Sequence, residues 1–283
     1  MKIQHNLSAA NAGRQLGVTS SRLKKSTEKL SSGYRINRAA DDAAGLSISE
    51  KLRSQIRGLN QATNNAHDGI SLLQTAEGGL NEQHSIIQRV RELVIQAAND
   101  TNTTEDRRAV ASEVKSLVDE LENISANTRF NTHRLLKQGS MYGTGSFELQ
   151  VGAQSKQSIK INIPCVDAIC LHMTPDDMLV NDDTFATSSH TTIAGLLENV
   201  DYALNKVSDA RTSVGTLQNR LEHTISNLEN TSENTQAGES RIRDLDMADE
   251  MVKYSKESIL QQAAQAMLAQ ANQANQGILA LLG

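Results

Sequence analysis

The chain has 283 residues, of which 38% are hydrophobic and only 2% aromatic, and its formal net charge is −5. The scarcity of large rings argues against a compact globule with an aromatic core, and the acidic balance argues against a nucleic-acid-binding protein. The first residues lack the apolar run of a secretory signal peptide, and no stretch of about 20 apolar residues predicts a membrane helix. The chain has only two prolines, Pro164 and Pro175, so the rest of it lacks the strongest helix breaker.

Residues 1–33 predict a helix with a narrow seam of small and apolar side chains. Its members alternate by three and four positions, as in a coiled coil: Ala9, Ala12, Leu16, Thr19, Leu23, Ser26 and Leu30. Because many of them are small, a partner helix can approach closely. The segment 34–45 is then predicted as a connector, bracketed by Gly33 and Gly45.

The longest periodic run follows, and we assign residues 46–136 to core helices. Apolar residues recur there every seven positions: Leu52, Leu59, Ala66, Leu73, Leu80, Ile87 and Val94. This run predicts one long helix that ends near residue 98. Thr103 and Asp106 then have the spacing of a capping box, which predicts the start of a shorter amphipathic helix.

The middle of the chain, 137–189, predicts a small β-hairpin followed by a short variable loop. Two runs alternate apolar and polar residues on either side of a Gly-containing turn. Their apolar members are Phe147, Leu149 and Val151, then Ile159, Ile161 and Ile163. From Pro164 to His190 no period is visible, so we expect an exposed loop or a small insertion.

Cys165 and Cys170 are the two cysteines and form a C-x4-C pair. They allow a disulfide, which the sequence alone cannot establish, or two free thiols. Two sulfur donors make a weak metal site unless further ligands are present. The histidines are scattered, without an HExxH motif, and no Gly-rich phosphate loop occurs. We therefore expect no enzyme activity, no cofactor and no metal.

Helical periodicity resumes at 190–230, where apolar residues again recur every seven positions: Ile193, Val200, Val207, Val214, Leu221 and Leu228. The stretch "NTSENTQAGESRIRDLD" interrupts this pattern, so 231–245 is predicted as a second connector. Residues 246–283 form the last predicted helix, with a heptad seam of Leu260, Ala264, Met267, Ala271, Ala274, Ile278 and Leu281. From Ser258 onward no side chain is charged, which suits a segment that orders only when it is buried on several sides.

Several segments together resemble bacterial flagellin, the subunit of the flagellar filament. They are "LSSGYRINRAADDAAGLSISEKLRSQ" near one end, "ESRIRDLDMADEMVKYSKESILQQAAQAM" near the other, and "QRVRELVIQAAN" and "RFNTHRLL" between them. The resemblance covers residues 1–136 and 190–283 and implies a short form with a reduced variable region. The expected fold is mainly α, with long antiparallel coiled-coil helices, paired N- and C-terminal helices and a small β-hairpin region.

The resemblance also implies a function and partners. The chain is expected to self-assemble into an extracellular filament for swimming, through a polymerisation seam of Ala9, Leu16, Leu23, Leu30 and the seven C-terminal seam residues. Expected partners are further copies of the chain, an export chaperone, the flagellar secretion apparatus, and filament cap and hook-junction proteins. Secretion without a cleaved signal peptide is expected, and neither nucleic acid nor a membrane is an expected partner.

The segment "QRVRELVIQ" resembles the site recognised by the innate receptor Toll-like receptor 5. Gln88, Arg89 and Leu93, with Glu113 on the next helix, fall at matching positions. Taken alone, the same segment is an ordinary amphipathic helix with a solvated charged face. The alternative function is that of the hook–filament junction protein, whose ends resemble flagellin.

Overall fold

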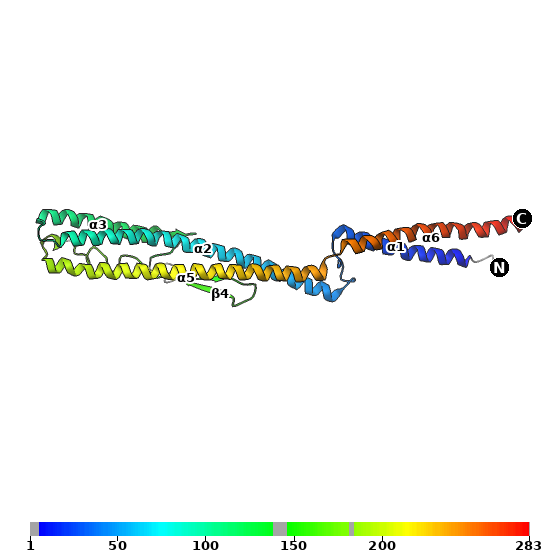
Figure 1. Ribbon diagram of the computed structural model, residues 1–283, viewed down its shortest axis with the longest axis horizontal. Helices are drawn as coiled ribbons and strands as arrows, with labels where there is room; N and C mark the ends of the chain where they lie inside the picture. Colours follow the sequence, from blue (N-terminus) through cyan, green and yellow to red (C-terminus); the bar gives the residue numbers. More distant parts are fainter. Residues whose placement is uncertain (1–5, 138–145, 181–183, 283) are drawn as a thin grey trace. The chain divides into compact units, whose positions relative to one another are not determined.

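The computed structural model describes residues 6–137, 146–180 and 184–282, with side chains described up to residue 273. In these ranges the helices are α1 (Leu7–Ser32), α2 (Ala43–Ala97), α3 (Thr104–Asn127), α4 (Thr184–Thr187), α5 (His190–Arg243) and α6 (Met247–Leu282) (Figure 1). The strands are β1 (Arg129–Phe130), β2 (His133–Arg134), β3 (Ser146–Gln150) and β4 (Ser158–Asn162). The predicted mainly α class with a small β region is confirmed. In the described part of the chain, no helix has both the length and the hydropathy needed to cross a membrane.

The chain divides into two compact units, to which α2 and α5 both contribute. Met1–Ile56 and Glu233–Gly283 make up what we call the terminal unit, and Arg57–Ser232 makes up the central unit.

In the terminal unit, α1 lies alongside α6 (Figure 1). Asn6 begins α1, because its side chain accepts a hydrogen bond from the backbone N–H of Ala9 at 3.0 Å. Gly33 ends the helix in the left-handed conformation, with φ of 73°, and its N–H donates to the carbonyl of Lys29 at 2.9 Å. The predicted helix end at residue 33 coincides with this glycine.

The chain segments that follow α1 and α5 pair with each other. The N–H of Arg35 donates to the carbonyl of Arg243 at 2.7 Å, and the N–H of Leu245 donates to the carbonyl of Gly33 at 3.0 Å. Tyr34 lies between these bonds, and the Arg243 guanidinium stands 4.7 Å from the centre of its ring. A short antiparallel bridge therefore fixes where both connectors run.

The predicted interruption over 231–245 is wrong for most of its length, since α5 continues to Arg243. The stretch is polar but contains no proline and one glycine, Gly238, so nothing forces a break. Ion pairs also support the helix: Glu239 lies 3.8 Å from Arg53, and Arg243 lies 2.9 Å from Glu50. The interruption reduces to the residues between Arg243 and Met247.

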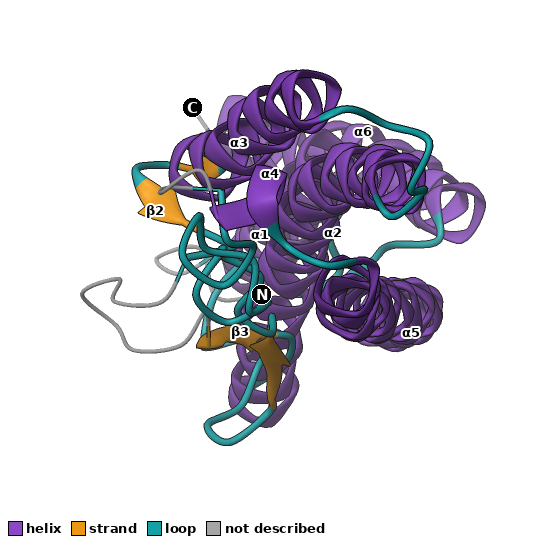
Figure 2. Cartoon of the chain, turned by 90° about the vertical axis from the view of Figure 1, so that its left-hand side faces the viewer, coloured by secondary structure: helices purple, strands orange, loops and turns teal. Residues whose placement is uncertain are grey.

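In the central unit, α2, α3 and α5 share one hydrophobic core (Figure 2). From α3 it contains Val110, Val114, Val118 and Leu121. The predicted heptad positions of α2 and α5 also contribute to it: Leu73, Leu80, Ile87 and Val94 from α2, and Val200, Val207, Val214 and Leu221 from α5. This prediction is confirmed. The strands and loops gather along one side of the helices (Figure 2).

The predicted capping box begins α3. The N–H of Thr103 donates to Asp106 Oδ2 at 2.9 Å, and the N–H of Asp106 donates to Thr103 Oγ1 at 3.3 Å. The Thr103 hydroxyl, which donates to Asp106 Oδ2 at 2.7 Å, and then the Thr103 N–H hold the pKa of Asp106 below its ordinary value. The sequence therefore locates this helix start correctly.

The predicted hairpin is also confirmed, with β3 antiparallel to β4, Phe147 opposite Ile161 and Leu149 opposite Ile159. A second, smaller hairpin of β1 and β2 was not predicted. Its turn places Asn131 and Thr132 at positive φ, and strands of two residues are too short to show an alternating pattern.

The prediction of an exposed loop after Pro164 is wrong. The side chains of Val166, Leu171, Met173, Met178 and Phe185 are fully buried in the core of the central unit. Apart from Phe185, which lies in the four-residue helix α4, these residues lie in turns and irregular backbone, so no periodic pattern marks them. This segment is a packed part of the fold.

Candidate functional site

The first candidate surface is the α1–α6 pair of the terminal unit. Every member of the predicted α1 seam is buried or half-buried, so this seam is the face that α1 turns toward α6. Near the start of α1, the side-chain amide of Asn6 donates to the carbonyl of Ala271 at 2.9 Å. Near its other end, Ser26 Oγ donates to Glu250 Oε1 at 2.6 Å, and both residues are buried. Polar contacts thus join the two helices at both ends.

The face of α6 that meets α1 differs from the predicted seam. Apart from Ser258, the buried and half-buried positions alternate by four and three: Glu250, Tyr254, Glu257, Gln261, Ala264, Leu268 and Ala271. Ala264 and Ala271 belong to both series. Leu260 and Met267 do not, and they are 43% and 65% exposed. The predicted seam residues Ala274, Ile278 and Leu281 lie outside the described side chains.

The more polar series meets α1 because of what α1 offers. Thr19 and Ser26 occupy seam positions, and Ser26 binds a carboxylate, so the matching residue on α6 is Glu250 rather than an aliphatic side chain. The four-and-three spacing of the polar series is present in the sequence. Because its residues are mostly polar, the series was not recognised as a helix-packing face.

Five exposed apolar side chains on one side of α6 form what we call the apolar stripe: Val252, Ile259, Leu260, Ala263 and Met267. At 3.6 residues per turn they lie within an arc of about 100°. Where the stripe meets α1, a groove of 610 Å³ opens, lined on the α6 side by Leu260, Ala264 and Met267 and on the α1 side by Ala12 and Thr19 among others. The apolar stripe is therefore exposed beside the α1–α6 contact.

The second candidate surface lies on α2 and α3 of the central unit. The guanidinium of Arg89 donates to Glu113 Oε1 from Nε at 3.2 Å and from Nη2 at 2.9 Å, and from Nη1 to Glu92 Oε2 at 3.1 Å. The bonds to Glu113 and then Glu92 raise the pKa of Arg89. Gln88 is exposed one residue away. Three of the four predicted recognition residues, Gln88, Arg89 and Glu113, thus share an exposed face.

Leu93, the fourth predicted recognition residue, is only 1% exposed and belongs to the hydrophobic core. It lies one helical turn from Arg89 and fixes the helix that carries it. A groove of 440 Å³ next to this face is lined by Gln88, Arg91, Glu92 and Ile95 of α2 with Asp201 and Leu204 of α5. The resemblance treats these four residues alike, and the structure separates the three exposed residues from the buried Leu93.

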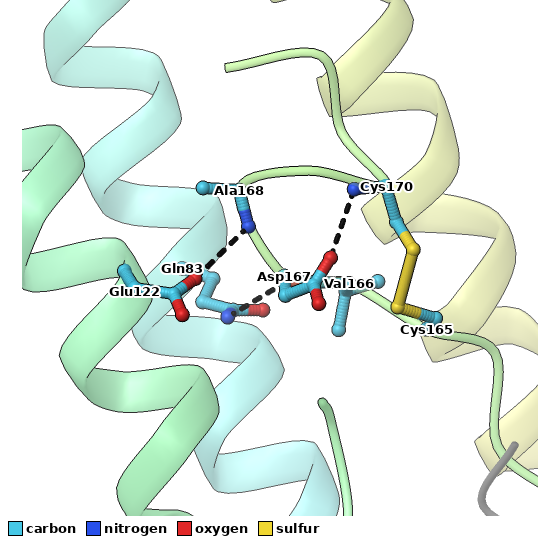
Figure 3. The surroundings of a disulfide bond; sticks show 7 residues. All are labelled: Gln83, Glu122, Cys165, Val166, Asp167, Ala168 and Cys170. Atoms are coloured by element: carbon cyan, nitrogen blue, oxygen red, sulfur yellow. Dashed lines mark hydrogen bonds between the residues drawn. A yellow bond between two sulfur atoms is a disulfide. The ribbon is translucent and has the colours of Figure 1, made fainter. Parts of the chain in front are cut away.

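The third feature is the segment that carries the two cysteines (Figure 3). Cys165 and Cys170 form a disulfide, one of the alternatives left open by the sequence, with their Cα atoms 6.2 Å apart. The residues between them are fixed to two helices. Gln83 Nε2 of α2 donates to the carbonyl of Val166 at 3.1 Å, and the N–H of Ala168 donates to Glu122 Oε2 of α3 at 3.4 Å. The loop is therefore held firmly to the central unit.

Known proteins are similar to this chain in both of its helical regions and along its full length. A family model described as the bacterial flagellin N-terminal helical region matches residues 3–140, and one described as the bacterial flagellin C-terminal helical region matches residues 197–282. The chain is similar to a flagellin of Halalkalibacterium halodurans, with 51% identity over 282 residues, and to a flagellin of Bacillus subtilis, with 47% identity over 304 residues. Both comparisons span 100% of each chain.

Among solved structures, a putative flagellar hook-associated protein from Vibrio parahaemolyticus is similar over 72% of this chain and 100% of its own. The TM-score is 0.63 and the identity 15%, so this likeness concerns the fold alone. The full-length matches are far closer in sequence. Since its helical regions match at both ends and relatives align along its whole length, the chain belongs to the bacterial flagellin family, whose members are structural subunits of the flagellar filament and not enzymes.

Proposed function

We propose that α1 and α6 are the element through which this filament subunit polymerises, with the apolar stripe as the contact for neighbouring copies. The observation that carries the proposal is the exposure of the stripe beside the α1–α6 pair. Covering such side chains releases free energy of about 25 cal/mol per Å² of apolar surface. From Ser258 onward α6 has no charged side chain, so burying it removes no charge from water.

The variant Met267→Lys tests this proposal. Polymerisation would bury an unpaired charge in every subunit, at a cost of several kcal/mol, so purified protein should fail to elongate filament seeds. The thermal melt of the central unit should not change, because Met267 belongs to the terminal unit and is exposed there. Electron microscopy and light scattering measure elongation.

The matched control is Gln262→Lys, which adds the same charge at an exposed position outside the apolar stripe. It should elongate seeds better than Met267→Lys. Filaments of normal length from Met267→Lys, or equal loss in both variants, would show that the stripe is not the contact surface. An inability of the unsubstituted chain to form filaments of its own would instead favour the hook–filament junction alternative.

We also propose that the exposed face of Gln88, Arg89 and Glu113 is recognised by Toll-like receptor 5. Its support is the Arg89–Glu113 pair, which holds an arginine in a fixed position on the surface, together with the family resemblance of the segment. Arginine fixed in this way is a frequent anchor in protein interfaces. In this proposal Leu93 supports the helix and does not touch the receptor, because it is buried.

Arg89→Asp and Arg91→Asp form a matched pair for this proposal. Both arginines are half-exposed on α2 and pair with an acid of a neighbouring helix, Glu113 for Arg89 and Asp201 for Arg91. Arg89→Asp should lower the potency of soluble monomer on receptor-expressing cells about tenfold or more, and Arg91→Asp much less. Equal potency of the two variants would exclude Arg89 as the anchor, and circular dichroism checks that both remain folded.

For delivery we propose export through the flagellar secretion apparatus without a cleaved signal peptide. An export chaperone would cover the apolar stripe before export, and filament cap and hook-junction proteins would bound the finished filament. The exposed stripe supports the need for a cover in the monomer. Sequencing the N-terminus of protein recovered from filaments tests the absence of cleavage.

A further inference from the structure

We propose that Cys165, Asp167 and Cys170 bind a thiophilic divalent cation, with Zn²⁺ as the representative ion, when the two cysteines are reduced. In the sequence Asp167 lies between the two cysteines, but the sequence does not show that its side chain approaches both sulfurs. The structure supplies this third ligand, since the two sulfurs and a carboxylate oxygen of Asp167 all lie within 4.8 Å of one another. In the oxidised chain the sulfurs are bonded to each other, so the site exists only in the dithiol form.

The distances suit coordination by all three residues. With Zn–S bonds of about 2.3 Å and tetrahedral angles, two thiolate ligands stand about 3.8 Å apart. Once the disulfide is broken, rotation about the side-chain bonds of the cysteines can open the sulfurs to that separation, and the Cα atoms are 6.2 Å apart. The carboxylate needs only a small shift to complete the set. Water would occupy the fourth position, as in open zinc sites.

The carboxylate is already oriented toward the cysteines. Asp167 Oδ1 accepts a hydrogen bond from the backbone N–H of Cys170 at 2.8 Å, which directs the group toward the second cysteine (Figure 3). Hydrogen bonds that orient a ligand in this way commonly strengthen metal binding. The carbonyl of Val166 and the N–H of Ala168 are held by Gln83 and Glu122 on rigid helices, so the loop does not have to be ordered by the ion.

Because the Asp167 carboxylate is buried, a bound cation would stabilise it. Asp167 is only 2% exposed, and its carboxylate accepts a hydrogen bond from an uncharged donor, the backbone N–H of Cys170. A buried carboxylate without a positive partner is costly, and a divalent cation would offset that cost. The two cysteines are half-exposed, which leaves a path for the ion to enter.

The binding reaction balances without a redox step. Two thiols lose two protons, and the resulting thiolates and the carboxylate bind one divalent cation. Thiolate donors select Zn²⁺ or Cd²⁺ over the oxygen-preferring Mg²⁺ and Ca²⁺. The site would thus keep the loop closed in reducing surroundings, and the disulfide would do so after oxidation.

The test uses the full-length monomer, reduced with a phosphine, desalted without oxygen and titrated with Zn²⁺ against a chromophoric chelator. Reduced protein should bind one Zn²⁺ per chain, and oxidised protein should not. Asp167→Asn should weaken binding about tenfold or more, and Cys165→Ser should abolish it. The control Asp209→Asn removes an exposed carboxylate of α5 and should bind like the unsubstituted chain.

X-ray absorption of the Zn²⁺-loaded, unsubstituted chain provides a readout that does not depend on how the variants fold. Two sulfur ligands with two lighter donors are expected. Equal binding by oxidised and reduced chains, no binding at micromolar Zn²⁺, unchanged affinity in folded Asp167→Asn, or a shell without two sulfurs would each overturn the proposal.

Discussion

The central unit and the terminal unit are built from the same element, the long helix, but they bury different side chains. The central unit encloses a core of leucine, isoleucine and valine at heptad positions of α2 and α5. Among the described side chains of the terminal unit, Ile36 is the one buried hydrophobic residue, whereas Thr19, Ser26, Ser49 and Glu250 are buried polar residues. The apolar stripe of α6 remains exposed.

This difference teaches that a seven-residue repeat indicates a helix that packs, but not what it packs against. Large apolar residues at the repeat positions of the central unit meet one another within the chain. In the terminal unit the inner positions combine leucines of α1 with small and polar residues, and the apolar stripe of α6 faces outward. The first unit is complete as a monomer, and the second presents a surface suited to other copies.

The largest effect is expected when one leucine is replaced in each unit. Leu80→Ala should destabilise the central unit by about 2–5 kcal/mol, because a fully buried side chain leaves a cavity. Leu260→Ala should lower monomer stability by less than about 1 kcal/mol, since exposed positions contribute little. Urea unfolding followed by circular dichroism measures both, and seeded elongation should rank them in the opposite order. Comparable losses of monomer stability would mean that the terminal unit has a core of its own.

A smaller effect is expected at two adjacent glycines of α2 in the central unit. A Cβ on Gly79 would stand 2.8 Å from Leu136 Cδ1 and 2.8 Å from Thr128 Oγ1, whereas one on Gly78 would meet no atom within 4 Å. Leu136 is fully buried and cannot move aside freely. Gly79→Ala should therefore cost about 1–3 kcal/mol. Gly78→Ala should stabilise by about 0.5–1 kcal/mol, because alanine favours the helix.

The two glycine variants carry the same substitution in the same helix. Helix propensity therefore contributes equally to both, and the difference between their thermal melts reports the packing around Gly79. A more stable Gly79→Ala protein would show that the approach of Leu136 and Thr128 to α2 is loose. That result would weaken the description of the central unit as closely packed.

Local and strongly periodic features could be predicted from the sequence. The capping box of Thr103 and Asp106 needs residues three apart, and the β3–β4 register follows from two alternating runs. The core positions of α2 and α5 follow from an apolar repeat that spans many turns. In each case the information lies within a few residues or is repeated often enough to be read.

Other features depend on partners that the sequence does not reveal. On α6 two series of positions have the same spacing and share Ala264 and Ala271. The choice between them depends on Ser26 of α1, which binds Glu250. Likewise, Asp167 becomes a neighbour of both cysteines only through turns that have no periodic signal. The resemblance selected Leu93 as a recognition residue, and the structure was needed to show that this side chain is buried.

The smallest effect expected is a dependence of the α1–α6 pair on pH through Glu250. Burial raises the pKa of this carboxyl group. Hydrogen bonds from Ser26 and Lys253, together with the charges of Lys253 and Lys29, lower the pKa by more than burial raises it, so it lies below 4.5. A pKa that is lower in the folded state adds stability above the unfolded-state value. That stability is lost as pH falls through the folded-state pKa.

The α1–α6 pair should therefore loosen as the pH falls below about 4.5, the ordinary value for this group. Amide exchange of peptides from α1 and α6, corrected for the intrinsic effect of pH, measures this. Glu250→Gln should flatten the dependence, because the amide does not titrate. Glu257→Gln, which removes the α6 carboxylate facing Arg22 at 3.8 Å, serves as the control and should keep most of it. If Glu250→Gln retained the full dependence, the buried Ser26–Glu250 contact would not be what makes the terminal unit sensitive to acid.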